Sequence, residues 1–286
     1  MAHTIGNPLS WIARGLAGVG HEFHEAVSHT GSESHVTWRV HALHPSDVIK
    51  ALRLGARDAL HFRSDVIALA LVYPVIGLIL SVFAFDMALL PMLFPLAAGF
   101  TLLGPVASVG FYELSRTREA GEETGWTRAL SGLRSRSIGP MLVLGVYLLA
   151  LFVLWMAAAF ATYMATMGPA MPESAGTFLR DVFTTLNGWT MIALGCGVGF
   201  VFAALVLLTC SISFPMLLDK QLGVPMSVAT SIRLAQKNPL TVALWGLAVA
   251  GLLILGTLPL FLGLIVVLPV LGHGSWHFYR MSVSYD

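Results

Sequence analysis

The sequence is poor in charge: Asp, Glu, Lys and Arg together make up 11% of its 286 residues. A soluble domain carries about 25% of charged residues, so a soluble fold is excluded as the main architecture. Hydrophobic residues account for 56% of the chain, and its mean hydropathy is +0.79. This composition predicts a membrane protein. The net charge of +1 gives no indication of nucleic-acid binding, and no nucleic-acid partner is expected.

Cysteine is also scarce. The only two, Cys196 and Cys210, fall in one apolar block about four helical turns apart, so they cannot bond to each other. A disulfide framework is therefore excluded. The sequence also lacks a Walker loop, a nucleophile elbow, a dinucleotide-binding fingerprint and a CxxC pair. We predict no catalytic residue and no enzymatic activity.

Long apolar blocks dominate what is present. A helix needs roughly 20 apolar residues to cross the hydrocarbon layer, and the last block is long enough for two spans if it divides at Gly256–Pro259. We therefore predict an all-α polytopic bundle of six transmembrane helices. The blocks are 66–85, 87–112, 138–165, 189–218 and 241–272, the last giving spans at 241–256 and 258–278.

Acidic and basic residues are missing from the centres of these spans. Proton pumps, ion-coupled carriers and cation channels usually place ionisable groups at that depth, so these classes are disfavoured. A permease for an uncharged or amphipathic solute remains compatible, because Pro91, Pro95, Pro105 and Pro259 allow discontinuous helices. Prolines also occur in spans for packing reasons, and both interpretations stay open.

The basic residues indicate the orientation. In the six-span arrangement every one of the 16 Lys and Arg residues except Arg180 falls on one side of the membrane. Such a bias marks the cytoplasmic side. We expect a multi-pass protein of the cytoplasmic membrane with both termini in the cytoplasm.

A sequence pattern occurs twice. Pro45-Ser-Asp-Val48 with Leu52-Arg53-Leu54 returns as Pro225-Met-Ser-Val228 with Ile232-Arg233-Leu234. The segment Pro105–Arg116 likewise returns as Pro269–Arg280. Each copy predicts an amphipathic surface helix followed by a membrane hairpin. We thus divide the chain into an N-terminal cytoplasmic extension, 1–44, and a membrane domain, 45–286. The domain comprises repeat one at 45–116, central spans at 138–165 and 189–218, and repeat two at 225–280.

The repeats also predict a cluster of paired side chains. Aligning Pro105 with Pro269 places Glu113 opposite His277, and we expect these two side chains to lie close together at the cytoplasmic boundary. Aromatic and arginine side chains one turn apart in each copy can add cation–π contacts. The predicted cluster is Glu113, His277, His273, Tyr112, Trp276, Arg116 and Arg280.

Three segments outside the spans have amphipathic patterns. Residues 8–29 predict a helix that either lies on the membrane or the protein itself, or docks a partner. Residues 45–63 and their second copy predict basic surface helices that favour anionic lipid headgroups. The docking candidates are Leu9, Ile12, Leu16, Val19 and Phe23, and the headgroup candidates are Lys50, Arg53, Arg57, Arg233 and Lys237.

Histidine offers two possible metal sites. His21 and His24 are not at the H-E-x-x-H spacing of zinc proteases. His273 and His277 lie one turn apart and could ligate a metal or one face of a haem, but no matching ligand stands out in another span. We predict no metal and no cofactor.

Two motifs resemble a known family. Gly104-Pro105 followed by Tyr112-Glu113-Leu114-Ser115-Arg116-x-Arg118-Glu119-x-Gly121-Glu122 is similar to the signature of the DUF2189 integral membrane proteins of bacteria. The closing Pro269-x2-Gly272-His273-x2-Trp276-His277-x-Tyr279-Arg280 resembles that family's C-terminal motif, and the resemblance covers roughly residues 40–282. Some members of the family carry a cytochrome c oxidase label, which implies association with a respiratory complex such as an oxidase or bc1.

These observations favour a non-catalytic accessory, assembly or bridging subunit of a larger bacterial membrane complex, respiratory if the resemblance is followed. The expected partners are membrane lipids and other membrane-protein subunits. Two alternatives stay open: a permease-like transporter, and a lipid-interacting membrane protein that uses the basic surface helices.

Overall fold

The computed structural model is described over most of the chain. In those residues it is helical apart from one two-stranded sheet, in agreement with the predicted class. The expected first span, 66–85, and the N-terminal helix, 8–29, lie outside the described residues. The described ranges are 37–61, 90–100, 104–122, 138–170, 172–220, 223–259 and 261–285.

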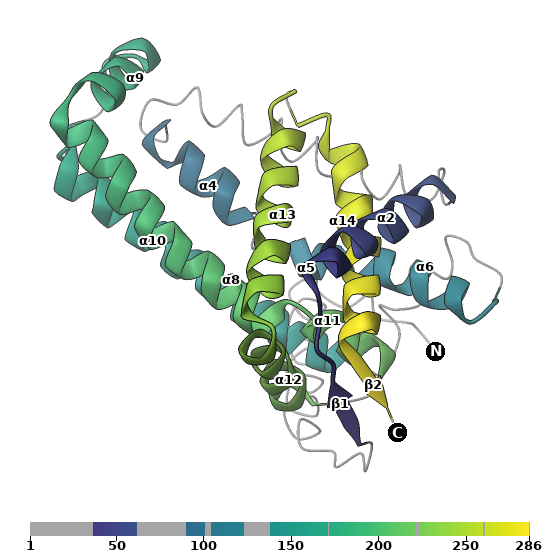
Figure 1. The fold of residues 1–286 in the computed structure, drawn as a ribbon. Helices are drawn as coiled ribbons and strands as arrows, with labels where there is room; N and C mark the ends of the chain where they lie inside the picture. The colour runs from purple at the N-terminus through teal and green to yellow at the C-terminus, as the bar shows by residue number, and fades with distance from the viewer. Residues whose placement is uncertain are drawn as a thin grey trace, which may run out of the picture.

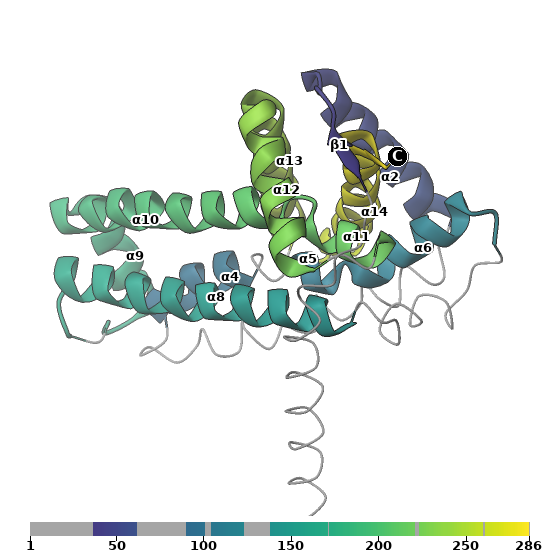
Figure 2. The ribbon, with the colours of Figure 1, turned by 90° about the horizontal axis from the view of Figure 1, so that it is seen from below.

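Two long antiparallel helices form the central pair expected from the sequence. Helix α8 (Ile138–Thr166) and helix α10 (Leu186–Cys210) run side by side (Figure 1 and Figure 2). The connection between them carries a short amphipathic helix, α9 (Ala175–Thr184), whose first turn is closed by a capping box of Ser174 and Thr177. A short helix therefore lies between the two long ones.

The long apolar block near the C-terminus is divided into two helices. Helix α13 (Pro239–Thr257) ends where the sequence predicts a break, and helix α14 (Leu264–Ser282) runs back beside it (Figure 1). Phe261 turns the chain with a left-handed backbone, φ 64°. The division of 241–272 near Thr257 is confirmed.

The second apolar block is irregular, as its prolines predict. Pro105 occupies the second residue of a helix, where its missing N–H has no intrahelical partner to lose. The block contains the 3-10 turn η2 (Leu90–Met92) and the helices α4 (Leu93–Phe100), α5 (Gly104–Ala107) and α6 (Val109–Glu119).

Among the described helices, three segments are long and apolar enough to cross a membrane. They are Ile138–Thr166, Leu186–Asp219, which joins α10 to α11 (Ser213–Asp219), and Pro239–Thr257. The chain is therefore an integral membrane protein with multi-pass helices. The other expected spans stay a prediction.

Both copies of the sequence pattern begin a helix. The first copy forms α2 (Pro45–His61), which lies across α14 (Figure 1), and the second forms α12 (Val224–Lys237). In front of α2, strand β1 (Trp38–Val40) pairs antiparallel with strand β2 (Val283–Tyr285) at the C-terminus. The chain in front of α2 is thus extended and is held to the C-terminal end of the chain.

The packed core lies at one end of the molecule, where α2, α6, α11, α12 and the C-terminal half of α14 converge; we call this the packed end. Fully buried side chains there come from three of these helices: Phe214, Met216, Leu234, Trp276, Phe278 and Tyr279. Helices α8 and α10 diverge from α13 toward α9, which marks the open end (Figure 1). Side-chain packing is therefore most extensive at the packed end, which also carries most of the charged side chains among the described residues.

Candidate functional site

A buried carboxylate organises the packed end. Asp58 lies near the C-terminus of α2 and is 5% exposed. It faces inward because Gly55, one turn earlier, lets α2 approach α14 closely: a Cβ at Gly55 would overlap the backbone atoms of Val270 and Gly274. The glycine therefore sets the position of the acid relative to α14.

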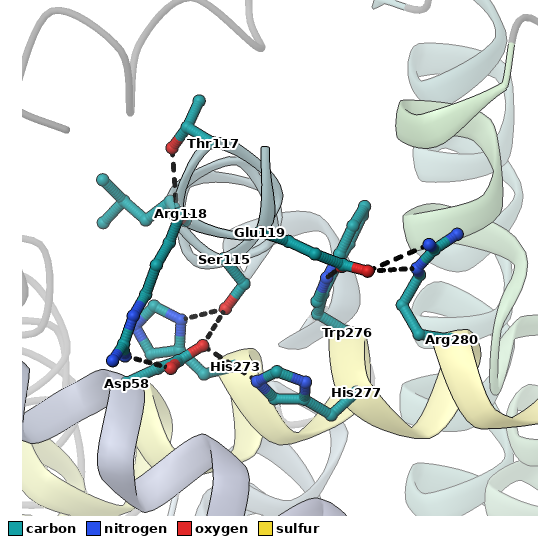
Figure 3. A network of polar contacts seen from close by, with 10 residues as sticks. Asp58, Ser115, Thr117, Arg118, Glu119, His273, Trp276, His277 and Arg280 are labelled. Atoms are coloured by element: carbon teal, nitrogen blue, oxygen red, sulfur yellow. Dashed lines mark hydrogen bonds and ion pairs between the residues drawn. The ribbon is translucent and has the colours of Figure 1, made fainter. Parts of the chain in front are cut away.

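Three donors from two other helices surround this carboxylate (Figure 3). Ser115 Oγ donates a hydrogen bond of 2.7 Å to Asp58 Oδ2, and Nε2 of His277 lies 2.9 Å from the same oxygen. The Arg118 guanidinium pairs with Oδ1. A single acid on α2 thus holds α6 and α14 together.

The environment of Asp58 favours its charged form. Burial by itself raises the pKa of this carboxyl, but the hydrogen bonds from His277 and Ser115 outweigh burial, and the pKa of Asp58 lies below its usual value of 3.8. Asp58 is therefore ionised at neutral pH and accepts from all three donors.

A second histidine extends the network. His273 is fully buried, and its Nδ1 lies 2.7 Å from Ser115 Oγ. Because Ser115 gives its own proton to Asp58, it accepts a proton from His273, which assigns the hydrogen of His273 to Nδ1. The ring of His273 packs at 57° against Phe111, with 5.5 Å between centroids.

The network contains serine, histidine and aspartate, the residue types of hydrolytic triads, in a different arrangement. Ser115 is 1% exposed and His273 is fully buried, so a substrate has no path to the hydroxyl. The Ser115 proton also points at Asp58 instead of a histidine base. The geometry suits a clamp between helices. Among the described residues, no group of three or more His, Cys, Asp or Glu side chains could hold a metal ion.

A second polar cluster lies beside the first on α14. Glu119, at the end of α6, accepts 3.0 Å hydrogen bonds from Trp276 Nε1 and from Arg280 Nε (Figure 3). Arg280 also approaches Asp219 of α11 at 3.6 Å, and Tyr279 donates to the same carboxylate at 2.7 Å. Helices α6, α11 and α14 are thereby joined.

Four residues of the predicted cluster fall into these two groups. His273 and His277 belong to the Asp58 network, and Trp276 and Arg280 belong to the Glu119 cluster. Glu113 is buried and accepts from Arg116 Nε at 2.9 Å. The proximity of Glu113 to His277 and the cation–π contacts stay predictions.

The headgroup candidates lie on the outer surface. Lys50, Arg53 and Arg57 are exposed along α2, and Arg233 is exposed on α12. Lys237 is exposed as well but donates to the Val40 carbonyl at 2.7 Å, so it also fixes the strand segment. The docking candidates between Leu9 and Phe23 lie outside the described residues.

A comparison with protein families gives one match. Residues 92–219 match the model of a predicted integral membrane protein family, DUF2189. We call these residues the DUF2189 region. No curated protein and no solved structure matches the chain.

The DUF2189 region extends from η2 to the end of α11, which is shorter than the resemblance over 40–282. It contributes Ser115, Arg118, Glu119 and Asp219 to the two clusters. Asp58 and the two histidines come from α2 and α14, outside the matched residues. Both clusters therefore connect the DUF2189 region to α14, which lies further along the chain, and the Asp58 network adds α2, which lies before the region.

Sequence reasoning missed five residues of the two clusters: Asp58, Ser115, Arg118, Glu119 and Asp219. Three of them lie within the quoted motif that starts at Tyr112, so the motif itself was the available signal. Asp58 had a weaker signal, as an acid on the inner face of a helix whose outer face carries basic residues. Its counterpart in the second copy, at the same distance from the opening proline, is Asn238, which is also buried. Asn238 holds the segment before α2 by accepting from Leu43 N at 2.7 Å.

Proposed function

We propose that the protein is a non-catalytic accessory subunit that assembles or bridges a larger complex in the bacterial cytoplasmic membrane. The observation that carries the proposal is the uncovered surface of α10. Within Leu186–Asp219, only 6% of an 18-residue apolar stretch is buried inside the protein. The corresponding share is 28% for Ile138–Thr166 and 22% for Pro239–Thr257. A helix with so little contact inside its own chain offers its surface to other membrane components.

Small residues on this surface favour a protein helix as the partner. Ala193 and Gly197 are exposed and four residues apart, and a Cβ at Gly197 would meet no atom within 4 Å. Small residues at this spacing let the backbone of a second helix approach closely, whereas lipid chains gain nothing from them. We define Ala193, Gly197 and the exposed Val201 as the docking face of α10.

The clusters at the packed end support a role without chemistry. Their polar groups are used in holding α2, α6, α11 and α14 together, and Ser115 and His273 are buried. A rigid end and a lightly covered helix suit a subunit that presents a surface. The family resemblance makes respiratory oxidase and bc1 complexes the first partners to test.

The orientation forms part of the proposal. We infer six spans, arranged as two repeats around α8 and α10, with the packed end and both termini in the cytoplasm. Support comes from the Lys and Arg residues, of which all but Arg180 fall on that side in the six-span arrangement. Labelling of single cysteines introduced at Lys50 and at Arg180 with a membrane-impermeant maleimide on intact cells tests the inference. Reagent added outside should modify position 180 alone.

Purification of the tagged protein in mild detergent, followed by mass spectrometry, tests the accessory role. We expect stoichiometric membrane-protein partners with the wild type and their loss with Gly197→Leu, which blocks the docking face. Gly195→Leu is the matched control, because its Cβ also meets nothing within 4 Å but lies beside a cavity on another side of α10. A wild-type protein that purifies alone, or partners retained by Gly197→Leu, would contradict the proposal.

A lipid-interacting role is the second candidate, and α2 carries the observation. Ile49 is 54% and Leu60 63% exposed on the helix that also exposes Lys50, Arg53 and Arg57. Among the described residues no ion pair is formed by these three cations, which leaves them available to anionic headgroups. Replacing the three by Gln should reduce the anionic lipid retained in native mass spectrometry, with no loss of protein partners.

A further inference from the structure

An apolar cavity lies at the open end of the molecule, far from both polar clusters. It has a volume of about 460 Å³ and is enclosed by η2, α4, α8, α9 and α10. This volume falls in the range of small-molecule sites, about 300–1,000 Å³. None of the residues that form the two polar clusters or the docking face of α10 lines this cavity.

The lining of the cavity offers little to a polar ligand. Among the described residues, no charged side chain lines it. The indole Nε1 of Trp155 donates to the Pro95 carbonyl at 2.7 Å, and the Tyr163 hydroxyl donates to the Ala170 carbonyl at 3.0 Å. A water molecule needs two to four polar partners in such a space, so the lining selects a hydrocarbon.

The cavity follows the long axis of the α8–α10 pair. Tyr163 lies near the C-terminal end of α8, and Trp155 lies 11 residues before Thr166, or about 16 Å deeper at 1.5 Å per residue. Cys196 lines the cavity at a similar depth, 10 residues into α10. The cavity thus reaches from the helix ends to about half of the 30 Å hydrocarbon layer, which is the depth of one leaflet.

Trp155 forms the inner limit of this space. Its ring lies over two glycines, Gly99 of α4 and Gly199 of α10, where any Cβ would overlap it. Phe202 packs against the ring edge-on at 5.8 Å. Because neighbours on α4 and α10 hold the indole, the cavity has a fixed floor.

Helix α9 closes the outer part of the cavity and marks the membrane surface. Its apolar face contributes Phe178 and Val182 to the lining, whereas Arg180 and Asp181 on the other face are in solvent-exposed positions. An amphipathic helix of this kind lies at the headgroup level. A molecule in the cavity therefore has its tail among apolar side chains and its head beside α9.

We propose that this cavity binds one acyl chain of a phospholipid from the leaflet on the α9 side. The hydrocarbon chain extends past Tyr163 toward Trp155, and the headgroup stays at the level of α9. This site is independent of the accessory role, because it lies on other surfaces of α8 and α10 than the docking face.

Photocrosslinking tests the site with the full-length protein in detergent. The probe is phosphatidylcholine with a diazirine near the end of one acyl chain, and peptide mass spectrometry maps the modified residues. We expect saturable labelling around Trp155, Ala159 and Cys196 that unlabelled phosphatidylcholine displaces. Gly195→Leu places a side chain in the cavity and should lower this labelling about tenfold or more, since a single misfitting methylene already costs about tenfold in an apolar pocket.

Gly197→Leu is the matched control and should label as the wild type does, because position 197 is on the same helix outside the lining. Equal labelling of Gly195→Leu and wild type would overturn the site, as would labelling spread evenly over the exposed faces of α8 and α10. Displacement by a polyprenol but not by phosphatidylcholine would overturn the acyl chain as occupant. The two substitutions have opposite expected effects on partners and on lipid, so the failure of one proposal is distinguishable from the failure of the other.

Discussion

Asp58 Oδ2 lies 2.9 Å from Nε2 of His277, and this pair sits one helical turn beyond the closest approach of their two helices. Gly55 and Gly274 mark that approach, three residues before Asp58 and three residues before His277. The glycine contact and the ion-pairing contact therefore share one face of α2 and one face of α14. Close backbone packing and the buried polar network are two parts of a single joint.

Replacing Asp58 by Asn should destabilise the protein by about 2 kcal/mol, because Arg118, His277 and Ser115 lose a charged acceptor. Thermal unfolding in detergent measures the loss. Arg57→Gln changes the neighbouring exposed residue and should unfold close to the wild type. Equal midpoints for Asp58→Asn and Arg57→Gln would show that the network contributes nothing to stability.

The same carboxylate should make stability depend on acid pH. The hydrogen bonds from His277 and Ser115 lower the folded-state pKa of Asp58 below 3.8. A carboxyl group whose pKa is lower in the folded than in the unfolded state stabilises the folded state at pH values above its unfolded-state pKa. That contribution is lost as the pH falls through the folded-state pKa. Unfolding midpoints from pH 6 down to about pH 3 should fall more steeply for the wild type than for Asp58→Asn. Parallel curves would contradict the assignment.

Gly55→Ala should destabilise the joint by about 2 kcal/mol, since its Cβ would overlap backbone atoms that cannot move aside. Gly274→Ala is the matched change on the facing helix. There the nearest atoms lie 3.5 Å away, which is ordinary contact, and the effect should be within about 0.5 kcal/mol. Thermal unfolding of the two variants, measured in parallel, tests this prediction. A larger loss of stability for Gly274→Ala than for Gly55→Ala would refute the packing argument.

A double-mutant cycle should show coupling between Asp58 and His277. Substitutions within one hydrogen-bonded network change the free energy of unfolding non-additively, by about 1 kcal/mol or more. Asp58→Asn and His277→Ala together should therefore cost less stability than the sum of the two single substitutions. The companion cycle with Glu113→Gln and His277→Ala tests the pairing expected from the repeats. Non-additive losses there would support a contact, and additive losses would count against it.

Much of the helical architecture followed from local sequence patterns. The apolar lengths of 138–165 and 189–218 predicted α8 and α10, and Pro259 with the glycine before it predicted the division between α13 and α14. The alternating residues around Trp38 are typical of an extended segment, but they do not identify the partner of β1. Strand β2 lies at the far end of the chain, and no local pattern of three residues identifies it.

The candidate site was only partly predictable. The repeat singled out His273, His277, Trp276 and Arg280, and the structure gives all four polar partners. The repeat did not single out Asp58. Helical periodicity shows that a residue lies on the inner face of a helix, but it does not show which charged groups of other helices contact it there. The alignment of the repeats paired Glu113 with His277, which stays a prediction, and the structure places Asp58 beside His277.

By itself, the sequence determined that this chain is a helical membrane protein with few charges, in which long apolar blocks follow one another along the chain. These properties depend on residues close together in the chain, since transfer to lipid and backbone hydrogen bonding are satisfied within each helix. Only the tertiary structure decided which helices share a carboxylate, where the core lies and where a cavity remains. Ser115 and His277 reach Asp58 from 57 and 219 residues away, and such contacts are set by how helices pack, at positions such as Gly55 where a missing side chain permits it.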